Sequence, residues 1–254
     1  MDSTVWASAA TGTTLDELRD RYAYPEDVVS PYVRANFVTS IDGAVTVDGS
    51  STGLGTPADR KVFGLLRELA DVILVGAGTV RAEDYGGART NEARRTWRSE
   101  NGLAAVPPVA VVTGTADIDP SSRLLTDTSV PALILTSRVA PEDNKQRLAE
   151  AGATVLEIGD DVVTPVQVLH TLETHGLNRV LCEGGPTLFG TLVAADLVDE
   201  LCLTTAPFLV GGGASRPAVS PLAVRRRMSL QHMMADEDGT VLSRWVRPRE
   251  SGRL

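Results

Sequence analysis

Short runs of consecutive apolar residues alternate along most of the chain with segments in which apolar residues recur every three or four positions. The runs are typical of strands buried on both faces of a sheet, and the periodic segments are typical of helices with one buried face. Strands are predicted at residues 33–41, 71–76, 107–113, 131–137, 153–158 and 178–183. Helices are predicted at residues 57–69, 141–151, 165–175 and 186–195. The alternation predicts an α/β fold with a mostly parallel sheet and helices on both of its faces.

The pattern changes near the C-terminal end of the chain. Longer apolar strands are predicted at residues 200–210, 226–234 and 240–246, and they would add an antiparallel edge, which makes the predicted sheet a mixed one. Residues 83–106 are polar and rich in glycine, so we expect a long surface excursion there that could serve as a lid.

The N-terminal segment has a different character. Residues 1–28 are polar and acidic, and Thr14 and Glu17 have the spacing of a capping box that would begin a short helix ending at Tyr22. We interpret residues 1–28 as an arm or a peripheral helix, and residues 29–254 as one domain. A chain of 254 residues is long enough to bury a sizeable core.

Charge and cysteine content narrow the class of protein. The net charge of -9 argues against nucleic acid or an anionic membrane as the main partner, because both attract clustered lysine and arginine. Cys182 and Cys202 both stand in apolar runs, so they are predicted to be buried strand thiols in a reducing environment. The first residues lack the features of a signal peptide, and no apolar run reaches the ~20 residues of a membrane span. We therefore expect a soluble cytoplasmic protein.

Two strand-to-helix junctions carry the candidate chemistry. In DVILVGAGTVRAED (71–84) and RVLCEGGPTLFG (179–190), an apolar strand ends at glycines and a helix begins with a threonine near its first turn. Glycine lets a ligand approach the backbone closely, and the free N–H groups of a helix N-terminus attract phosphate. Each junction could alternatively be a tight turn that requires positive φ. Because a dinucleotide has a pyrophosphate and several polar ends to hold, the pair of junctions predicts a nucleotide cofactor.

Other common cofactor and metal signatures do not fit this chain. Arg81 stands where the third glycine of a Rossmann fingerprint would be, and no P-loop sequence occurs. His170, His175 and His232 are too scattered for a set of metal ligands, so they are expected to be ordinary histidines and no metal is predicted.

Blocks of sequence around these junctions occur together in a particular order. The blocks are TSIDG (39–43), DRKVFGLLRELAD (59–71), ILVGAGTVRAED (73–84), LCEGGPTLFG (181–190), LVDELCL (197–203) and APFLVGGG (206–213). Over about residues 31–246 the set resembles the pyrimidine reductase family of riboflavin biosynthesis. The resemblance implies a dihydrofolate-reductase-like fold and NADPH as the hydride donor. It also implies reduction of 5-amino-6-(5-phosphoribosylamino)uracil to its ribitylamino form.

The resemblance assigns roles to individual residues. Glu183 and Asp84 are the catalytic candidates, and either one or a bound water would supply a proton. Asn36 and Ser40 would line the substrate pocket, whereas Asp42 is interpreted as part of an ordinary Asp-Gly turn. The expected cofactor contacts are Asp59, Gly76, Gly78, Thr79, Gly184, Gly185, Thr187 and Leu188.

Two further expectations concern cofactor preference and assembly. Ser137 and Arg138 follow a predicted strand and could bind the 2′-phosphate of NADPH, or could simply form the exit from that strand. The long apolar strands at 200–210 and 240–246 are expected to leave a sheet edge that a second copy covers. A homodimer is therefore expected, as the family also implies.

The chain departs from the family pattern at two positions. Ala44 stands where the family usually has a basic residue, and Tyr85 stands where it usually has proline. Arg60, Arg81 or Arg89 could replace the lost cation in binding a phosphorylated substrate. The zinc deaminase sequence that often accompanies the reductase is missing, so another chain would carry out deamination. Reduction of a pterin such as dihydrofolate, or NADP binding without catalysis, remain as alternative functions.

Overall fold

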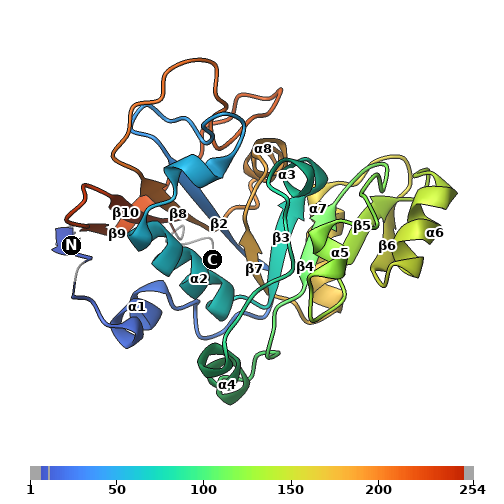
Figure 1. Ribbon diagram of the computed structural model, residues 1–254, viewed down its shortest axis with the longest axis horizontal. Helices are drawn as coiled ribbons and strands as arrows, with labels where there is room; N and C mark the ends of the chain where they lie inside the picture. The colour runs from blue at the N-terminus through green and yellow to red at the C-terminus, as the bar shows by residue number, and fades with distance from the viewer. Residues whose placement is uncertain (1–6, 11, 249–254) are drawn as a thin grey trace, which may run out of the picture.

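The computed structural model describes residues 7–10 and 12–248 (Figure 1). Within these residues the strands form one ten-stranded sheet in the order β1-β9-β10-β8-β2-β7-β3-β4-β5-β6. The strands are β1 (Ala7–Ala9), β2 (Tyr32–Thr39), β3 (Val72–Gly76), β4 (Val109–Val112), β5 (Leu133–Ser137), β6 (Thr154–Gly159), β7 (Arg179–Cys182), β8 (Glu200–Thr205), β9 (Ser229–Ala235) and β10 (Val241–Val246). The helices are α1 (Leu15–Tyr22), α2 (Pro57–Leu69), α3 (Ala77–Ala82), α4 (Glu92–Glu100), α5 (Arg123–Thr126), α6 (Glu142–Glu150), α7 (Pro165–Thr174) and α8 (Pro186–Ala194), with a 3-10 turn η1 (Ser51–Leu54).

The sheet is mixed and mostly parallel, as the sequence predicts. β10 runs antiparallel to both of its neighbours, β8 and β9. The other strand pairs of the described sheet are parallel. The predicted antiparallel strands at the C-terminal end are thereby confirmed.

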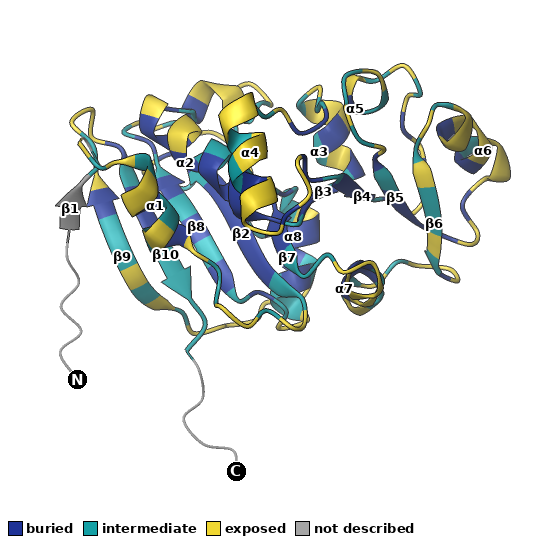
Figure 2. Ribbon diagram, turned by 90° about the horizontal axis from the view of Figure 1, so that it is seen from below, coloured by how far each residue is buried: buried dark blue, intermediate teal, exposed yellow. Residues whose placement is uncertain are grey.

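Alternate residues of the central strands point to opposite faces of the sheet and build two apolar cores. In β3, Ile73 and Val75 belong to the core that α1, α2 and α6 cover, whereas Val72 and Leu74 belong to the core under α7 and α8. The central strands are therefore buried on both sides, as Figure 2 shows. Helices on both faces are confirmed.

The helix boundaries follow from capping residues. Thr56 accepts a hydrogen bond from the backbone N–H of Asp59, and Pro57 occupies the first turn of α2, where a missing N–H costs little. The capping box of Thr14 and Glu17 at the start of α1 is present, which confirms that prediction. Cys182 and Cys202 lie buried in β7 and β8, as expected of strand thiols.

The predicted excursion at residues 83–106 contains a helix that the sequence analysis did not predict. α4 lies near the middle of this excursion, and its Arg98 is fully buried. The Arg98 guanidinium donates to the carbonyls of Glu68, Ala70 and Ala104 at 2.8, 2.7 and 2.7 Å. Arg98 therefore satisfies carbonyls at the C-terminal end of α2, which a helix cannot pair internally.

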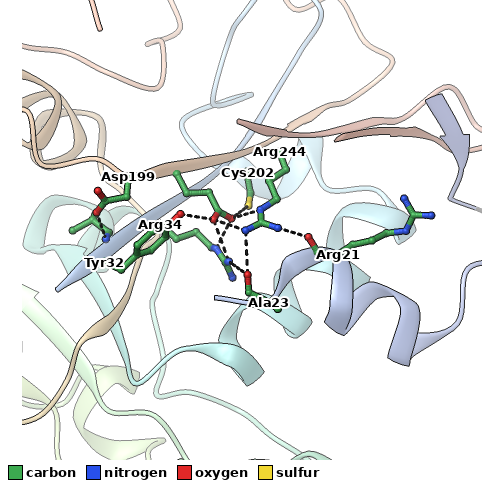
Figure 3. Close-up of polar contacts among 9 residues, drawn as sticks. Arg21, Ala23, Tyr32, Arg34, Asp199, Cys202 and Arg244 are labelled. Carbon is green, nitrogen blue, oxygen red and sulfur yellow. Dashed lines mark hydrogen bonds and ion pairs between the residues drawn. The ribbon is translucent and has the colours of Figure 1, made fainter. Parts of the chain in front are cut away.

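The N-terminal segment is joined to the sheet through a buried charge cluster (Figure 3). Glu200 on β8 pairs with Arg34 on β2 at 2.6 Å and with Arg244 on β10 at 2.8 Å. Both arginines also donate to the carbonyl of Ala23, which follows α1. Although burial opposes it, the charge of Arg34 and the bonds from Arg244 lower the pKa of Glu200. The cluster holds α1, the central strand and the C-terminal strands together.

The edges of the sheet differ from those that the sequence suggested. β8 lies between β2 and β10, and β10 lies between β8 and β9, so neither strand has a free edge. The strand predicted at 200–210 also ends earlier, at Thr205. The strands at the two edges of the described sheet are β1 and β6. The expectation of an exposed C-terminal edge was therefore wrong.

No helix in the described part of the chain combines the length and the apolar character that crossing a membrane requires.

Candidate active site

A cavity of about 650 Å³ lies where the carboxyl ends of β3 and β7 meet α2, α3 and α8. Ligands of open parallel sheets usually bind at this end of the strands. Its wall is completed by residues of β2, by η1 and the loop before it, and by the segment from Glu83 to Arg89. Figure 1 shows that α3 and α8 begin at the same end of the sheet, each just beyond the strand that leads into it, β3 or β7.

The two predicted glycine junctions lie against each other in the wall of this cavity. The backbone N–H of Gly76 donates to the carbonyl of Gly184 at 2.9 Å. A Cβ atom on Gly185 would lie 2.5 Å from Oγ1 of Thr79, and Gly184 has φ of +104°. The junctions therefore need glycine both for close packing and for backbone conformation. The peptide between Gly184 and Gly185 is cis.

The first turns of α3 and α8 leave backbone donors available to a ligand. Their N-cap residues are Gly76 and Gly185, and neither helix has a side-chain capping bond. At Thr56 and Thr164, by contrast, a side chain caps the helix. Donors of this kind at the N-terminus of α8, beside the cavity, suit the phosphates of a nucleotide.

Glu183 lies on the floor of the cavity, held by two other side chains. Arg67 of α2 donates from Nε to Oε1 and from Nη2 to Oε2, each at 2.7 Å. The Tyr85 hydroxyl also donates to Oε2, and it accepts a hydrogen bond from Arg67 Nη2 at 2.8 Å. The Glu183 side chain is only 3% exposed. Two parallel hydrogen bonds from one guanidinium fix the orientation of the carboxylate plane.

The environment of Glu183 keeps its partners in their donor forms. Burial is the largest effect on Arg67 and lowers its pKa, but the charge of Glu183 and the interactions with Tyr85 together outweigh burial and raise the pKa of that guanidinium. Burial, followed by the charge of Glu183, raises the pKa of Tyr85 well above its ordinary value. Tyr85 therefore stays protonated and Arg67 stays charged at neutral pH.

α2 supplies a second acid and a cation to the cavity wall. Asp59 is 8% exposed, and burial raises its pKa against the effects of a hydrogen bond with Thr204 and the charge of Arg60. Arg60 is exposed and donates from Nη1 to the Gly55 carbonyl at 3.0 Å. One wall thus presents a buried acid beside an accessible guanidinium.

Charged residues at the rim of the cavity pair with one another. Asp84 is largely exposed, has φ of +45°, and pairs with Arg123 at 3.2 Å. Arg123 also pairs with Asp127 at 3.0 Å, and Arg89 pairs with the same carboxylate. Much of the rim charge is therefore already neutralised within the protein.

Most of the residues that the sequence suggested line this one cavity. They are Asn36, Asp59, Arg60, Gly76, Gly78, Thr79, Asp84, Arg89, Glu183, Gly184, Gly185, Thr187 and Leu188. Residues from β2, α2, α3, α8 and the loops between them are thereby brought together.

Four suggested residues lie elsewhere. One is Arg81, whose Nη1 donates to the Asp117 carbonyl at 2.9 Å. The hydroxyl of Ser40 is buried and donates to Asp42, and the hydroxyl of Ser137 is buried and donates to the Gly114 carbonyl at 3.0 Å. Arg138 pairs with Asp160 at 3.2 Å, with both side chains largely exposed. None of the four is among the residues that line the cavity.

The Asp42 carboxylate is bonded to the loop that follows β8. It accepts hydrogen bonds from Ser40 and from the backbone N–H groups of Val210 and Gly211. These bonds, that of Ser40 first, lower the pKa of Asp42 to about 2. Asp42 thus ties its own turn to the loop after β8, and Ser215 of that loop lines the cavity.

Several residues that line the cavity were not predicted from the sequence. Arg67 and Arg123 were not proposed, and Tyr85 was noted only as a departure from the family. Glu83 was also missed: its carboxylate accepts hydrogen bonds from the Ser50 hydroxyl and the Ser51 N–H, both at 2.8 Å. Arg67 could have been suspected, since it lies in a family block; Arg123 lies outside every block.

Comparison with known proteins agrees with this geometry. A profile of the RibD C-terminal domain matches residues 31–242. A 2,5-diamino-6-ribosylamino-4(3H)-pyrimidinone 5′-phosphate reductase of Archaeoglobus fulgidus is 31% identical over 183 residues, which cover 72% of this chain and 83% of the relative. A reductase of the same name from Methanothermobacter thermautotrophicus is 34% identical over 191 residues, covering 74% and 83%.

Longer relatives and solved structures give the same picture. The riboflavin biosynthesis protein RibD of Mycobacterium tuberculosis is 32% identical over 183 residues, which cover 72% of this chain but only 44% of that protein. A pyrimidine reductase-like protein of Corynebacterium diphtheriae has a solved structure with a TM-score of 0.81 and 26% identity, covering 94% of this chain and 100% of that one. The match to the domain profile, with glycine junctions and acidic residues gathered at one cavity, shows that this chain belongs to the RibD C-terminal domain family.

Proposed function

We propose that this protein is a nicotinamide-dependent reductase of a ribosylaminopyrimidine 5′-phosphate in riboflavin biosynthesis. The observation that carries the proposal is one cavity in which two glycine junctions and Glu183 meet. The names of the relatives from Archaeoglobus fulgidus and Methanothermobacter thermautotrophicus support the substrate class. The substrate we expect is the deaminated form, 5-amino-6-(5-phosphoribosylamino)uracil, and the 2,5-diamino form is the second candidate because those relatives are named for it.

The cavity fits a dinucleotide cofactor. The N-terminus of α8 offers backbone N–H groups without a side-chain cap, as a pyrophosphate requires. A Cβ on Gly78 would meet no protein atom within 4 Å, so the space in front of this glycine is open to a ligand. Gly76, Gly78, Thr79, Gly184, Gly185, Thr187 and Leu188 would hold the cofactor, with Asp59 beside it. A reduced nicotinamide supplies the hydride when it is bound.

The acids of the cavity suit different tasks. Glu183, paired with Arg67, offers hydrogen-bond acceptors that are held in place. Asp59 is a buried acid in the wall whose pKa is raised, which suits a proton donor. Replacing Asp59 with asparagine is expected to lower kcat and to remove the fall in rate as pH rises through the Asp59 pKa. Asp84, at the rim of the cavity, remains a catalytic candidate. Measuring kcat of Asp84→Asn over the same pH range tests it.

Arg60 is the proposed anchor for the substrate phosphate. Its guanidinium is exposed and bonds to a carbonyl, whereas Arg89 and Arg123 are already paired with Asp127. A cation that is not neutralised by a carboxylate gives a dianionic phosphate the stronger attraction. Asn36 lines the same cavity and would contact the pyrimidine.

The test is oxidation of NADPH in the presence of each candidate substrate. Oxidation with either ribosylaminopyrimidine phosphate, and a ribitylamino product identified by mass spectrometry, is the expected result. Oxidation with dihydrofolate alone would make the protein a pterin reductase, and NADPH binding without oxidation of any substrate would leave a non-catalytic nucleotide-binding protein. Repeating the assay with NADH tests the preference for NADPH, which here rests on the family resemblance because Ser137 is buried and bonded to Gly114.

A homodimer is proposed from the family resemblance alone. The strands first expected to form its interface, β8 and β10, are paired on both sides and do not support it. Light scattering at micromolar concentration is expected to give twice the monomer mass, and a monomer mass would contradict the proposal.

A further inference from the structure

The Glu183 carboxylate has a nearly complete set of hydrogen-bond donors before any ligand is added. A carboxylate offers about four lone-pair positions, two on each oxygen. Oε2 accepts from Arg67 Nη2 and from the Tyr85 hydroxyl, so both of its positions are used. Oε1 accepts from Arg67 Nε, which leaves one position. Glu183 lines the cavity although its side chain is 3% exposed, so this position is the natural one for a bound molecule.

Tyr85 is the unusual member of this group. It stands where the family usually has proline, and a proline could donate nothing to Glu183. Its hydroxyl also accepts from Arg67, so the phenol bridges the carboxylate and the guanidinium. Phe63 stacks on Arg67, with the guanidinium carbon 4.3 Å from the ring centre. Arg67 is thus fixed by an aromatic ring on α2 as well as by its two polar partners.

We propose that Tyr85 and Arg67 are positioning residues that fix the rotation of the Glu183 carboxylate and direct the last Oε1 lone pair toward an N–H or O–H group of the bound substrate. The inference rests on the proposed function and adds to it a specific role for Tyr85. Tyr85 occupies the second Oε2 position, so a substrate donor can bind productively only at Oε1. Without the hydroxyl, Oε2 has an open position and the carboxylate has one restraint fewer.

A double-mutant cycle on kcat/KM tests whether Tyr85 acts through Glu183. Tyr85→Phe keeps the ring and removes only the hydroxyl, so kcat/KM for the pyrimidine substrate is expected to fall about tenfold, the effect of one hydrogen bond to a charged group. Most of the loss is expected in kcat, because the interaction matters most in the transition state. In a Glu183→Gln background, the same Tyr85→Phe change is expected to alter kcat/KM by less than about twofold, since the carboxylate that the hydroxyl orients is absent.

A matched control and a second variant accompany the cycle. Tyr32→Phe also removes a tyrosine hydroxyl bonded to a carboxylate, that of Glu200 at 3.1 Å, but away from the cavity; it is expected to keep wild-type kcat/KM. Arg67→Lys keeps the charge but loses the planar fork, and it is expected to lower kcat in the same way as Tyr85→Phe. Melting temperatures of all variants establish that they are folded.

The outcomes separate this inference from the proposed function. A wild-type enzyme that reduces neither pyrimidine would overturn the proposed function and the inference with it. An active wild type in which Tyr85→Phe has no effect, or in which the effects of Tyr85→Phe and Glu183→Gln multiply, would overturn the inference alone. Loss of activity in Tyr32→Phe as large as that in Tyr85→Phe would equally contradict it, because a general loss of packing would then explain both.

Discussion

The glycines at the two junctions are required by their contacts as well as by their flexibility. Gly184 has φ of +104°, which residues with a Cβ atom seldom adopt, and Gly185 faces Thr79 so closely that there is no room for one. The sequence could indicate these glycines because paired glycines after an apolar strand are a local signal. It could not indicate that the two junctions pack against each other, because that contact joins segments more than a hundred residues apart in the chain.

Gly185→Ala should therefore damage both the fold and cofactor binding. The new methyl group would meet Oγ1 of Thr79 at 2.5 Å, so the Thr79 side chain or the first turn of α8 must shift, and NADPH affinity is expected to fall at least about tenfold. Calorimetric titration with NADPH measures this. Gly114→Ala is the control, because a Cβ there meets no atom within 4 Å and Gly114 lies outside the cavity. Equal NADPH affinities for wild type and Gly185→Ala would remove this junction from the cofactor site.

At the scale of elements, helices with local signals could be predicted and those held by distant partners could not. Thr56 and Pro57 mark the start of α2 in the sequence itself. α4 has the sequence EARRTWRSE, which lacks an apolar stripe, and it is held by the buried Arg98 bonded to α2 and to Ala104. A buried arginine with carbonyl partners resembles a surface residue in the sequence. The predicted excursion therefore concealed a helix.

The loop after β8 is held by hydrogen bonds from Val210 and Gly211 to the Asp42 carboxylate. The sequence suggested only that Asp42 belongs to an ordinary turn. The Asp42 pKa is lowered to about 2 in the folded state, below its unfolded value of about 3.9. Its contribution to stability is therefore complete above about pH 4 and is lost as pH falls toward 2. Asp42→Asn is expected to lower the melting temperature at pH 7, with a smaller difference from wild type near pH 3. A difference that stays constant or grows on acidification would contradict this role.

At the scale of the whole molecule, one buried carboxylate joins segments from both ends of the chain. Glu200 pairs with Arg34 and Arg244, and both arginines reach the Ala23 carbonyl beyond α1 (Figure 3). The mixed α/β sheet could be predicted because each parallel strand is an apolar run. The strand order could not, because apolar runs do not specify their neighbours, and the predicted exposed edge failed for that reason.

Glu200→Gln is expected to destabilise the protein by about 3–5 kcal/mol, because it leaves two arginines near a buried, uncharged amide. Urea denaturation measures the change. Asp160→Asn is the matched control: it breaks an ion pair with Arg138 in which both side chains are largely exposed, and such pairs contribute about 0–1 kcal/mol. Similar losses for the two variants would show that the buried cluster has no special role.

Steady-state oxidation of NADPH by the wild type and by Glu183→Gln tests the central claim most directly, namely that this cavity is a pyrimidine reductase site. The wild type is expected to oxidise NADPH only when a ribosylaminopyrimidine 5′-phosphate is present. Glu183→Gln should bind NADPH with little change in affinity while its turnover falls by roughly 10²–10⁴-fold, the range for loss of a positioned acid or base. Wild-type turnover in Glu183→Gln, or no substrate-dependent oxidation by the wild type, would contradict the account.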